Sequence, residues 1–400
     1  MVSQQHGLNY PQLRISNYES QIQHSPSYWE QQSFWQGIDA LVIGSGLVGL
    51  NAALELKRLA PTWRVMVVDR SPLPLGASTR NAGFACFGSM TELLDDLQHM
   101  SESEAWELVE MRWRGLQLLR QTIGDQHLRY EPKGGIEVFT PADEASYEAC
   151  LERMESFNQT LRNITGLDET FVAADDKIKD WGLKGIPHAI LNRAEGQIHT
   201  GEMMHRLWTL AREMGIEQLG GLPIIGLHPE SDGITLQTEN GWSFQVPRVV
   251  VATNGFARRL LPDLPVQPAR NQVLVTSPIA GLKLNGAFHY DRGYVYFRDI
   301  DGRVLIGGAR NLDPDGETTD QLGHTALIEN RLKEILHEVI LPDQPFDIDY
   351  RWSGIMGIGP VKRPIIEALH PNLVVSVRLG GMGVAIGSEV GRSAAKLLGK

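Results

Sequence analysis

Residues 38–49 read IDALVIGSGLVG and run directly into LNAALELKRLA, residues 50–60. The first part is a short apolar run that predicts a buried strand, and the second places apolar side chains at helical spacing. A strand, a glycine turn and a helix in this order predict a dinucleotide-binding unit. Gly44 permits the tight turn, Gly46 lets a pyrophosphate approach the backbone, and Gly49 lets the helix sit close to the strand.

A second apolar run, RVMVVDR at residues 64–70, predicts a neighbouring strand. Asp69 stands at its end, twenty residues after Gly49. A carboxylate there can accept hydrogen bonds from ribose hydroxyls, which favours FAD or NAD over a cofactor with a 2′-phosphate. The unpaired N–H groups at the start of the first helix are suited to phosphate.

Three further segments bear on the choice between FAD and NAD. LGASTRNAGF, residues 75–84, is rich in small and hydroxyl side chains, as suits a loop whose amides approach a ligand. WSFQVPRVVVATNGF, residues 242–256, predicts a hairpin arm and then a buried strand that runs into a polar turn. RLGGMGVAIGSEVGRSAAKLLG, residues 378–399, predicts a glycine turn that opens a C-terminal helix.

With these landmarks in this order, the chain resembles the FAD-dependent oxidoreductases related to D-amino-acid oxidase, glycine oxidase and sarcosine oxidase. The resemblance runs from about residue 38 to the C-terminus. In that family the VVVATNG strand marks FAD proteins and not NAD-only dehydrogenases. STRNAGF and the upstream SYW, residues 27–29, are most similar to the gamma-glutamylputrescine oxidase branch.

The resemblance implies a cofactor site, carried over residue by residue. The glycine turn would hold the pyrophosphate, Asp69 the ribose, and the 77–83 loop the ribityl chain and flavin edge, while Ile224 would contact adenine through its backbone. The turn after VVV would close over the cofactor, and the 380–384 segment would oppose negative charge on the reduced flavin with a helix N-terminus. The implied residues are Gly44, Ser45, Gly46, Leu47, Val48, Gly49, Asp69, Arg70, Ala77, Ser78, Thr79, Arg80, Asn81, Ala82, Gly83, Ile224, Ala252, Thr253, Asn254, Gly255, Gly380, Gly381, Met382, Gly383 and Val384.

The predicted fold class is α/β, with a Rossmann-like FAD-binding domain that is discontinuous in sequence and an inserted, sheet-rich α+β substrate domain. The resemblance assigns residues 1–96, 192–268 and 347–400 to the FAD-binding domain, and residues 97–191 and 269–346 to the substrate domain. Periodicity predicts helices at 91–124, 142–163, 201–215 and about 325–340, and paired strands around the Asp301-Gly302 turn.

On the substrate side, Tyr296 occupies the position of a substrate-binding tyrosine in D-amino-acid oxidases. Tyr294 and Arg298 share its strand parity, so all three are expected on one face, which is either the substrate side or an ordinary solvated face. The arginine that those oxidases keep before a P-V-x-x-P segment is missing, because Gly357-Ile358-Gly359 precedes Pro360. Either Arg80, Arg298 or Lys362 replaces it, or the substrate has no α-carboxylate.

Composition narrows the functional classes and the cellular location that the protein can have. A formal net charge of −11 argues against nucleic-acid binding. Cys86 and Cys150 are the two cysteines of the sequence, so we expect no disulfide framework and, without a cysteine in the C-terminal half, non-covalent FAD. We find no secretory signal, no long apolar run and no metal motif, and we therefore expect a cytoplasmic protein without a transmembrane segment.

The leading hypothesis is an FAD-dependent oxidase or dehydrogenase that acts on the C–N bond of a small amine or amino acid by hydride transfer to flavin N5, followed by imine hydrolysis. Its electron acceptor would be oxygen, or a quinone or other electron carrier. Two alternatives stay open. One is a flavin-dependent dehydrogenase of a 2-hydroxy acid or polyol, and the other is a flavoprotein with a degenerate pocket that acts as an assembly or electron-transfer partner.

Overall fold

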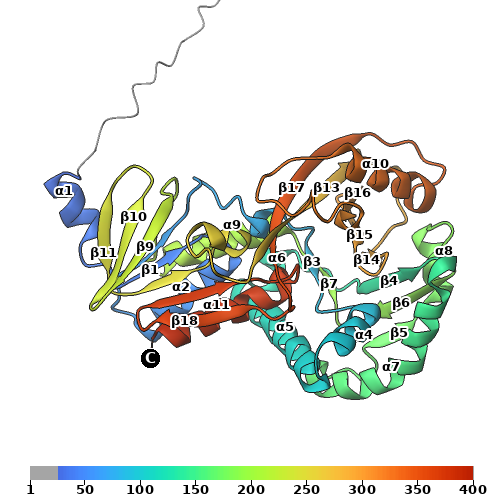
Figure 1. Ribbon diagram of the computed structural model, residues 1–400. Helices are drawn as coiled ribbons and strands as arrows, with labels where there is room; N and C mark the ends of the chain where they lie inside the picture. Colours follow the sequence, from blue (N-terminus) through green and yellow to red (C-terminus); the bar gives the residue numbers. More distant parts are fainter. Residues whose placement is uncertain (1–25, 400) are drawn as a thin grey trace, which may run out of the picture.

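The computed structural model describes residues 26–399. Residues 1–25, the beginning of the predicted FAD-binding segment 1–96, lie outside the described residues, as does Lys400. Figure 1 shows two lobes, each built around a β-sheet. This arrangement confirms the predicted α/β class with a second sheet-rich part.

The first lobe contains a sheet with the strand order β18-β19-β12-β1-β2-β8. The strands are β1 (Ala40–Ile43), β2 (Val65–Val68), β8 (Glu217–Leu219), β12 (Val249–Val251), β18 (Ile365–His370) and β19 (Leu373–Val377). Strands β1, β2, β8, β12 and β19 pair in parallel, and β18 is antiparallel to β19. The predicted strands at 38–44, 64–70 and after Pro247 are therefore confirmed as neighbours in one Rossmann-like sheet.

Both faces of this sheet are covered, as the continuous apolar runs of its strands require. Helices α2 (Leu47–Leu59) and α11 (Gly383–Leu398) pack on one face (Figure 1). The hairpin strands β9 (Ile224–Glu230), β10 (Gly233–Thr238) and β11 (Ser243–Val246) form a three-stranded sheet that covers the other. The Asn240-Gly241 turn joins β10 to β11, which confirms the hairpin arm predicted for the 242–256 segment.

The second lobe contains a sheet with the strand order β17-β13-β16-β15-β14-β4-β6-β5. Its strands are β4 (Gly135–Phe139), β5 (Phe171–Ala173), β6 (His188–Asn192), β13 (Gln267–Thr276), β14 (Ala287–Tyr290), β15 (Val295–Ile300), β16 (Arg303–Gly308) and β17 (Ile348–Ile358). Helix α10 (Ala326–Ile335) packs on one face of it, against the core that holds Phe288, Phe297 and Ile306. Alternation along β15 therefore turns Tyr296 to the opposite face.

Helices α4 (Met90–His99), α5 (Glu102–Ile123) and α7 (Glu144–Thr165) lie within or close to the ranges predicted from periodicity, as does α9 (Thr200–Glu213). Two short elements join the lobes: helix α3 (Ala77–Arg80), and strand β3 (Phe84–Ala85), which pairs with β7 (Gly196–Gln197). No helix within residues 26–399 is both long and apolar enough to span a bilayer.

The domain boundaries stay a prediction, but one element crosses the division that they imply. Strand β17 belongs to segment 347–400, which the sequence assigned to the FAD-binding domain, yet it pairs along its whole length with β13 in the second sheet. The physical reason is that a chain returning to the cofactor sheet can first pair with an available strand edge, and sequence pattern does not reveal which edge is free.

Prediction: Gly391→Val separates the two helices that cover the first sheet. A Cβ at Gly391 would lie 2.4 Å from the backbone oxygen of Val48 in α2, so α2 and α11 must move apart. We expect a loss of about 1–3 kcal/mol in the free energy of unfolding, measured by urea denaturation. Lys396→Val, an exposed position on the same helix, controls for the low helix propensity of valine. Equal losses in both variants would contradict the packing argument.

Candidate active site

A cavity of about 570 Å³ lies between the two large sheets. Its lining comes from the turn after β1, the end of β2, the 74–86 segment, the turn after β12, and the start of α11 on the cofactor side. Strands β13, β14, β15 and β17 contribute Asn271, His289, Tyr296 and Met356 from the other sheet. One cavity therefore connects the predicted nucleotide turn to the predicted substrate face.

Asp69 fixes the glycine turn by accepting two hydrogen bonds from it. The backbone N–H and the hydroxyl of Ser45 both donate to Asp69 Oδ2 at 2.8 Å. Gly44 adopts φ +108°, and a Cβ there would lie 2.7 Å from the oxygen of Ala252. The contact at Gly49 is even closer, since a Cβ added there would lie 1.9 Å from the oxygen of Gly44. Asp69 lines the cavity as well, so it both shapes the turn and faces the cavity into which the turn opens.

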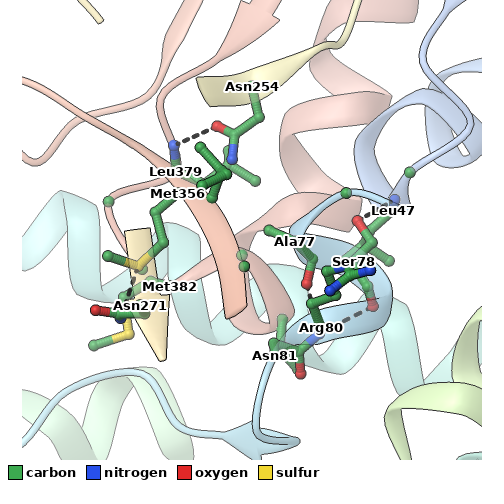
Figure 2. Close-up of a pocket in the computed structure, with 18 of the residues that line it drawn as sticks. Leu47, Ala77, Ser78, Arg80, Asn81, Asn254, Asn271, Met356, Leu379 and Met382 are labelled. Atoms are coloured by element: carbon green, nitrogen blue, oxygen red, sulfur yellow. Dashed lines mark hydrogen bonds between the residues drawn. The ribbon is translucent and has the colours of Figure 1, made fainter. Parts of the chain in front are cut away.

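The 77–83 loop crosses from the nucleotide end toward the second sheet. Ser78 Oγ accepts a hydrogen bond from the backbone N–H of Leu47 at 2.8 Å, which fixes the loop against the start of α2 (Figure 2). Asn81 Oδ1 accepts from the N–H of Gly83 and from the hydroxyl of Thr200, at 2.9 Å each. These contacts leave the loop backbone facing the cavity, as close approach to a ligand requires.

The opposite wall is built by Asn254 and the segment before α11. Asn254 adopts φ +44°, and its Oδ1 accepts from the N–H groups of Arg378 at 3.1 Å and Leu379 at 3.4 Å (Figure 2). Gly380 and Gly381 follow with φ +57° and +85°, and the first turn of α11 lines the cavity. Its N–H groups have no intrahelical acceptors and present positive partial charge there.

The residues implied for the cofactor fit a flavin dinucleotide, since a glycine turn, an acid, a small-residue loop and a helix N-terminus follow one another along a single cavity. All of them line that cavity except Ser45, Gly49, Thr79, Gly83 and Gly255, which pack behind the lining. The structure adds lining residues that the sequence did not indicate, among them Leu222, Phe256 and Leu260 near the nucleotide end.

Tyr296 and Tyr294 both line the second half of the cavity. The ring of Tyr296 lies across Gly307, where a Cβ would come within 2.7 Å of it, and its hydroxyl is hydrogen-bonded to Asn271. Burial raises the pKa of Tyr296, so it stays a neutral phenol. Tyr294 is 40% exposed and lies at the mouth.

The prediction that Arg298 contacts the substrate is wrong. Its side chain is 3% exposed, lies outside the cavity lining, and donates to the carbonyl oxygens of Ala82, Gly83 and Ile198, the last at 2.7 Å. Burial lowers the pKa of Arg298 to about 10. Strand parity correctly predicted that this side chain points toward the cofactor lobe. The 77–83 loop lies in between, however, and its carbonyl oxygens accept hydrogen bonds from Arg298.

The other candidates for an anion-binding cation are also occupied. Arg80 lines the cavity, but its guanidinium donates to the oxygens of Leu75 at 3.1 Å and Ser353 at 2.9 Å. Lys362 lies 2.6 Å from Asp96 and 3.2 Å from Asp95. Lys362 is therefore paired with acids, whereas Arg80 is held by two backbone oxygens and has no acidic partner among the described residues.

The structure explains why the expected arginine of the 357–359 segment is absent. A Cβ at Gly357 would lie 2.6 Å from Asn254 Oδ1, and one at Gly359 would lie 2.6 Å from Arg378 Cδ. The strand therefore packs directly on the turn that holds the start of α11. Met356 faces the cavity from the same strand (Figure 2).

A polar cluster that sequence reasoning did not detect lies in the wall of the second half of the cavity, where Cys86 and His289 line it and Glu195 is buried behind them. Polar atoms of Cys86, Glu195 and His289 lie within 4.8 Å of one another. Glu195 Oε1 accepts from the N–H groups of Phe87 at 2.6 Å and Gly88 at 3.0 Å. Thiol, carboxylate and imidazole are also ligand types that zinc accepts. Strands β14 and β7 bring together residues that are distant in sequence, so spacing carries no signal for the cluster.

Comparison with known proteins agrees with this geometry. The chain is 20% identical over 376 residues to the probable oxidoreductase OrdL of Haemophilus influenzae, covering 90% of this chain and 82% of that protein. It is 36% identical over 241 residues to N-methyl-L-tryptophan oxidase of Escherichia coli O139:H28, but this match spans only 58% of either protein.

In structure, the chain is similar to glycine oxidase from Bacillus cereus, with a TM-score of 0.70 at 18% identity over 90% of this chain and 94% of that one. This likeness shows the shared fold. The family described as FAD dependent oxidoreductase (DAO) matches residues 39–397, which is nearly the whole described chain. The chain belongs to this family of FAD-dependent oxidoreductases.

Proposed function

We propose that this flavoprotein oxidises the C–N bond of a small amine or amino acid, passing a hydride to flavin N5 and releasing an imine that hydrolyses. The observation that supports this most is the continuity of the cavity. It joins the dinucleotide turn to a chamber lined by Phe84, His289 and Tyr296. Bound FAD supplies the electron-accepting group, and the chain has to bind, orient and desolvate the substrate.

The chamber is suited to an uncharged amine. Phe84 stacks edge-on against His289 and Tyr296, with ring centroids 5.4 and 5.6 Å apart. Burial lowers the pKa of His289 to about 4 and raises the pKa of Glu195 to about 7, while it also raises the pKa of Cys86. Imidazole and thiol are therefore neutral at neutral pH. A wall with aromatic rings and a neutral imidazole presents little charge to the substrate and favours the neutral nitrogen that hydride transfer requires.

The printed names of the relatives support the same chemistry, since N-methyl-L-tryptophan oxidase and glycine oxidase are both named for substrates with a C–N bond. Non-covalent attachment of FAD is also part of the proposal. Cys150 is buried within a separate hydrophobic cluster, and the raised pKa of Cys86 keeps its thiol protonated. We further propose a cytoplasmic protein that passes electrons to oxygen, or to a quinone or other carrier.

Prediction: the purified protein is yellow, and acid precipitation releases FAD. Under anaerobic conditions, a panel of amines, amino acids and N-methyl amino acids should bleach the flavin absorbance, with release of ammonia or the dealkylated amine. Bleaching by 2-hydroxy acids or polyols alone would favour the other oxidoreductase class. Failure of every compound to reduce the flavin would favour a role as an assembly or electron-transfer partner.

Prediction: Gly46→Val abolishes retention of FAD while the fold survives. A Cβ at Gly46 would lie 2.9 Å from Ser78 Oγ, which holds the 77–83 loop to Leu47, and the branched side chain would occupy the path of the pyrophosphate. FAD content per chain is measured by absorbance and the fold by circular dichroism. Full FAD occupancy in a folded variant would refute the cofactor placement.

Prediction: Glu195→Gln removes a pH dependence of stability. The pKa of Glu195 is raised in the folded protein to about 7, from 4.5 in the unfolded chain, because burial disfavours the carboxylate. The folded state therefore keeps a proton that the unfolded chain releases, so this contribution is present below pH 4.5 and is lost as the pH rises through 7. Its full size is about 3 kcal/mol.

The measurement compares urea unfolding of both proteins at pH 5 and pH 7.5. Relative to the glutamine variant, wild type should lose about 2 kcal/mol across this interval, because pH 5 and pH 7.5 span most but not all of the titration. His289 acts in the opposite direction, since its lowered pKa increases stability as the pH rises through its titration range. Both proteins contain it, so it enters the difference only as far as the loss of Glu195, within 4.8 Å, changes the His289 pKa. A difference between the two proteins that does not vary with pH would contradict the burial argument.

A further inference from the structure

Two arginines at the mouth of the substrate chamber, Arg292 and Arg310, differ from the other cations of the cavity. Both line it beside Tyr294. Within residues 26–399, neither guanidinium has an acidic partner or a carbonyl acceptor, and Arg310 only lies over the ring of Tyr294 at 5.8 Å. Guanidinium groups without counter-ions present N–H donors that an anion can accept.

The remaining cations that line the cavity are held by acids or backbone oxygens, or lie at the nucleotide end. Arg80 donates to two backbone oxygens, Lys362 is paired with Asp95 and Asp96, and Arg259 is 2.7 Å from Asp320. Arg70 lies at the nucleotide end, stacked 3.8 Å over the ring of Phe256. This comparison leaves the 291–294 turn and the segment at Arg310 as the source of an anion-binding group for the substrate.

The acidic side of the mouth does not cancel this positive charge. Glu92 and Asp95 also line the cavity, but Glu92 lies 3.1 Å from the buried guanidinium of Arg112, and Asp95 lies 3.2 Å from Lys362. Glu92 and Asp95 are therefore paired with cations. Asp291, next to Arg292 in the same turn, is hydrogen-bonded to Asn311 and offsets only part of the charge of the two arginines. The uncompensated charge at the mouth attracts an anion.

The backbone holds both arginines in place. Asp291 and Arg292 adopt φ +50° and +53°, and Ala309, before Arg310, adopts φ +60°, which is left-handed backbone that non-glycine residues rarely occupy. The two segments are joined by the Ala309 N–H, which donates to the oxygen of Tyr294 at 2.8 Å. The side-chain amide of Asn311 adds a 3.1 Å hydrogen bond to Asp291. The positive φ values at Asp291 and Arg292 belong to the hairpin turn between β14 and β15, which the Gly293 N–H closes on the oxygen of Tyr290 at 3.1 Å.

We infer that Arg310, assisted by Arg292, binds the carboxylate of the substrate. This assigns the substrate class as an amino acid or another amine that carries a carboxylate, and it rests on the proposed oxidation of a C–N bond. The pair takes over the charge that the crowded 357–359 segment has no space to supply. A guanidinium offers two parallel N–H donors that match the geometry of a carboxylate.

The first experiment measures binding alone. Sodium propionate is titrated into the FAD-loaded protein at constant ionic strength, and its dissociation constant is read from the change in the flavin spectrum. Arg310→Met should weaken propionate binding by about tenfold or more, Arg292→Met by less, and Arg310→Lys should recover part of the loss. Arg162→Met, on the distant helix α7, is the matched control and should bind as wild type.

The second experiment uses matched substrates in anaerobic flavin reduction: N-methyl-L-tryptophan against N-methyltryptamine, and glycine against methylamine. Arg310→Met should weaken apparent binding of the carboxylate-bearing member by about tenfold or more and leave that of the other amine within about twofold. FAD content and Tm confirm that each variant is folded. Equal losses on both members of a pair, or unchanged propionate binding in both Met variants, would overturn the inference.

The two proposals fail separately. If no compound reduces the flavin, the proposed function is wrong, but the propionate titration still decides whether the arginines bind a carboxylate. If amines reduce the flavin and the arginine variants keep wild-type propionate affinity, the carboxylate site is wrong and the oxidation stands.

Discussion

The arrangement of the whole cavity depends on one buried cation. Arg298 leaves strand β15 of the second sheet and donates to the oxygens of Ala82, Gly83 and Ile198, on segments that reach it from the cofactor lobe. Removing a guanidinium from water is costly, and the carbonyl oxygens compensate for that cost only in this geometry. Gly83 has to be glycine, because a Cβ there would lie 2.5 Å from the guanidinium. The substrate sheet is thereby tied to the cofactor loop.

The same loop is held at further points by both sheets. Ser78 accepts from the start of α2, Arg80 donates to the oxygen of Ser353 in β17, and the indole N–H of Trp352 donates to the oxygen of Arg80 at 2.9 Å. A loop fixed from both sides has little freedom to move relative to either. A flavin bound along it would therefore keep a constant position relative to Tyr296 and His289, which is what hydride transfer between two bound groups requires.

Charge is distributed along the cavity in a way that follows from burial. The nucleotide end offers backbone N–H groups and Arg70, and the middle is lined by neutral rings. At the mouth, the acids are paired with Arg112 and Lys362, while Arg292 and Arg310 have no counter-ion among the described residues. An anionic substrate with an amine thus meets attraction at the entrance and a desolvating, uncharged chamber beyond it.

The sequence alone determined the dinucleotide unit, because its signal is local. The spacing of Gly44, Gly46 and Gly49 and the position of Asp69 directly encode a turn, a close helix–strand contact and an acid at a strand end. The predicted glycine turn before α11 is likewise a local feature of the sequence. Such features depend on residues that are near in sequence, so pattern and spacing are sufficient to find them.

Only the tertiary structure decided the substrate side. Strand parity indicated which face of the sheet Arg298 lies on, but not how deeply it is buried. Its guanidinium donates to backbone oxygens of segments from the other lobe, so it holds the structure together instead of contacting the substrate. Arg292 and Arg310 lie on separate turns that come together only when β14, β15 and β16 pair. Cys86, Glu195 and His289 likewise meet through strand pairing across the chain. Contacts between distant segments carry no spacing rule, so the fold is needed to reveal them.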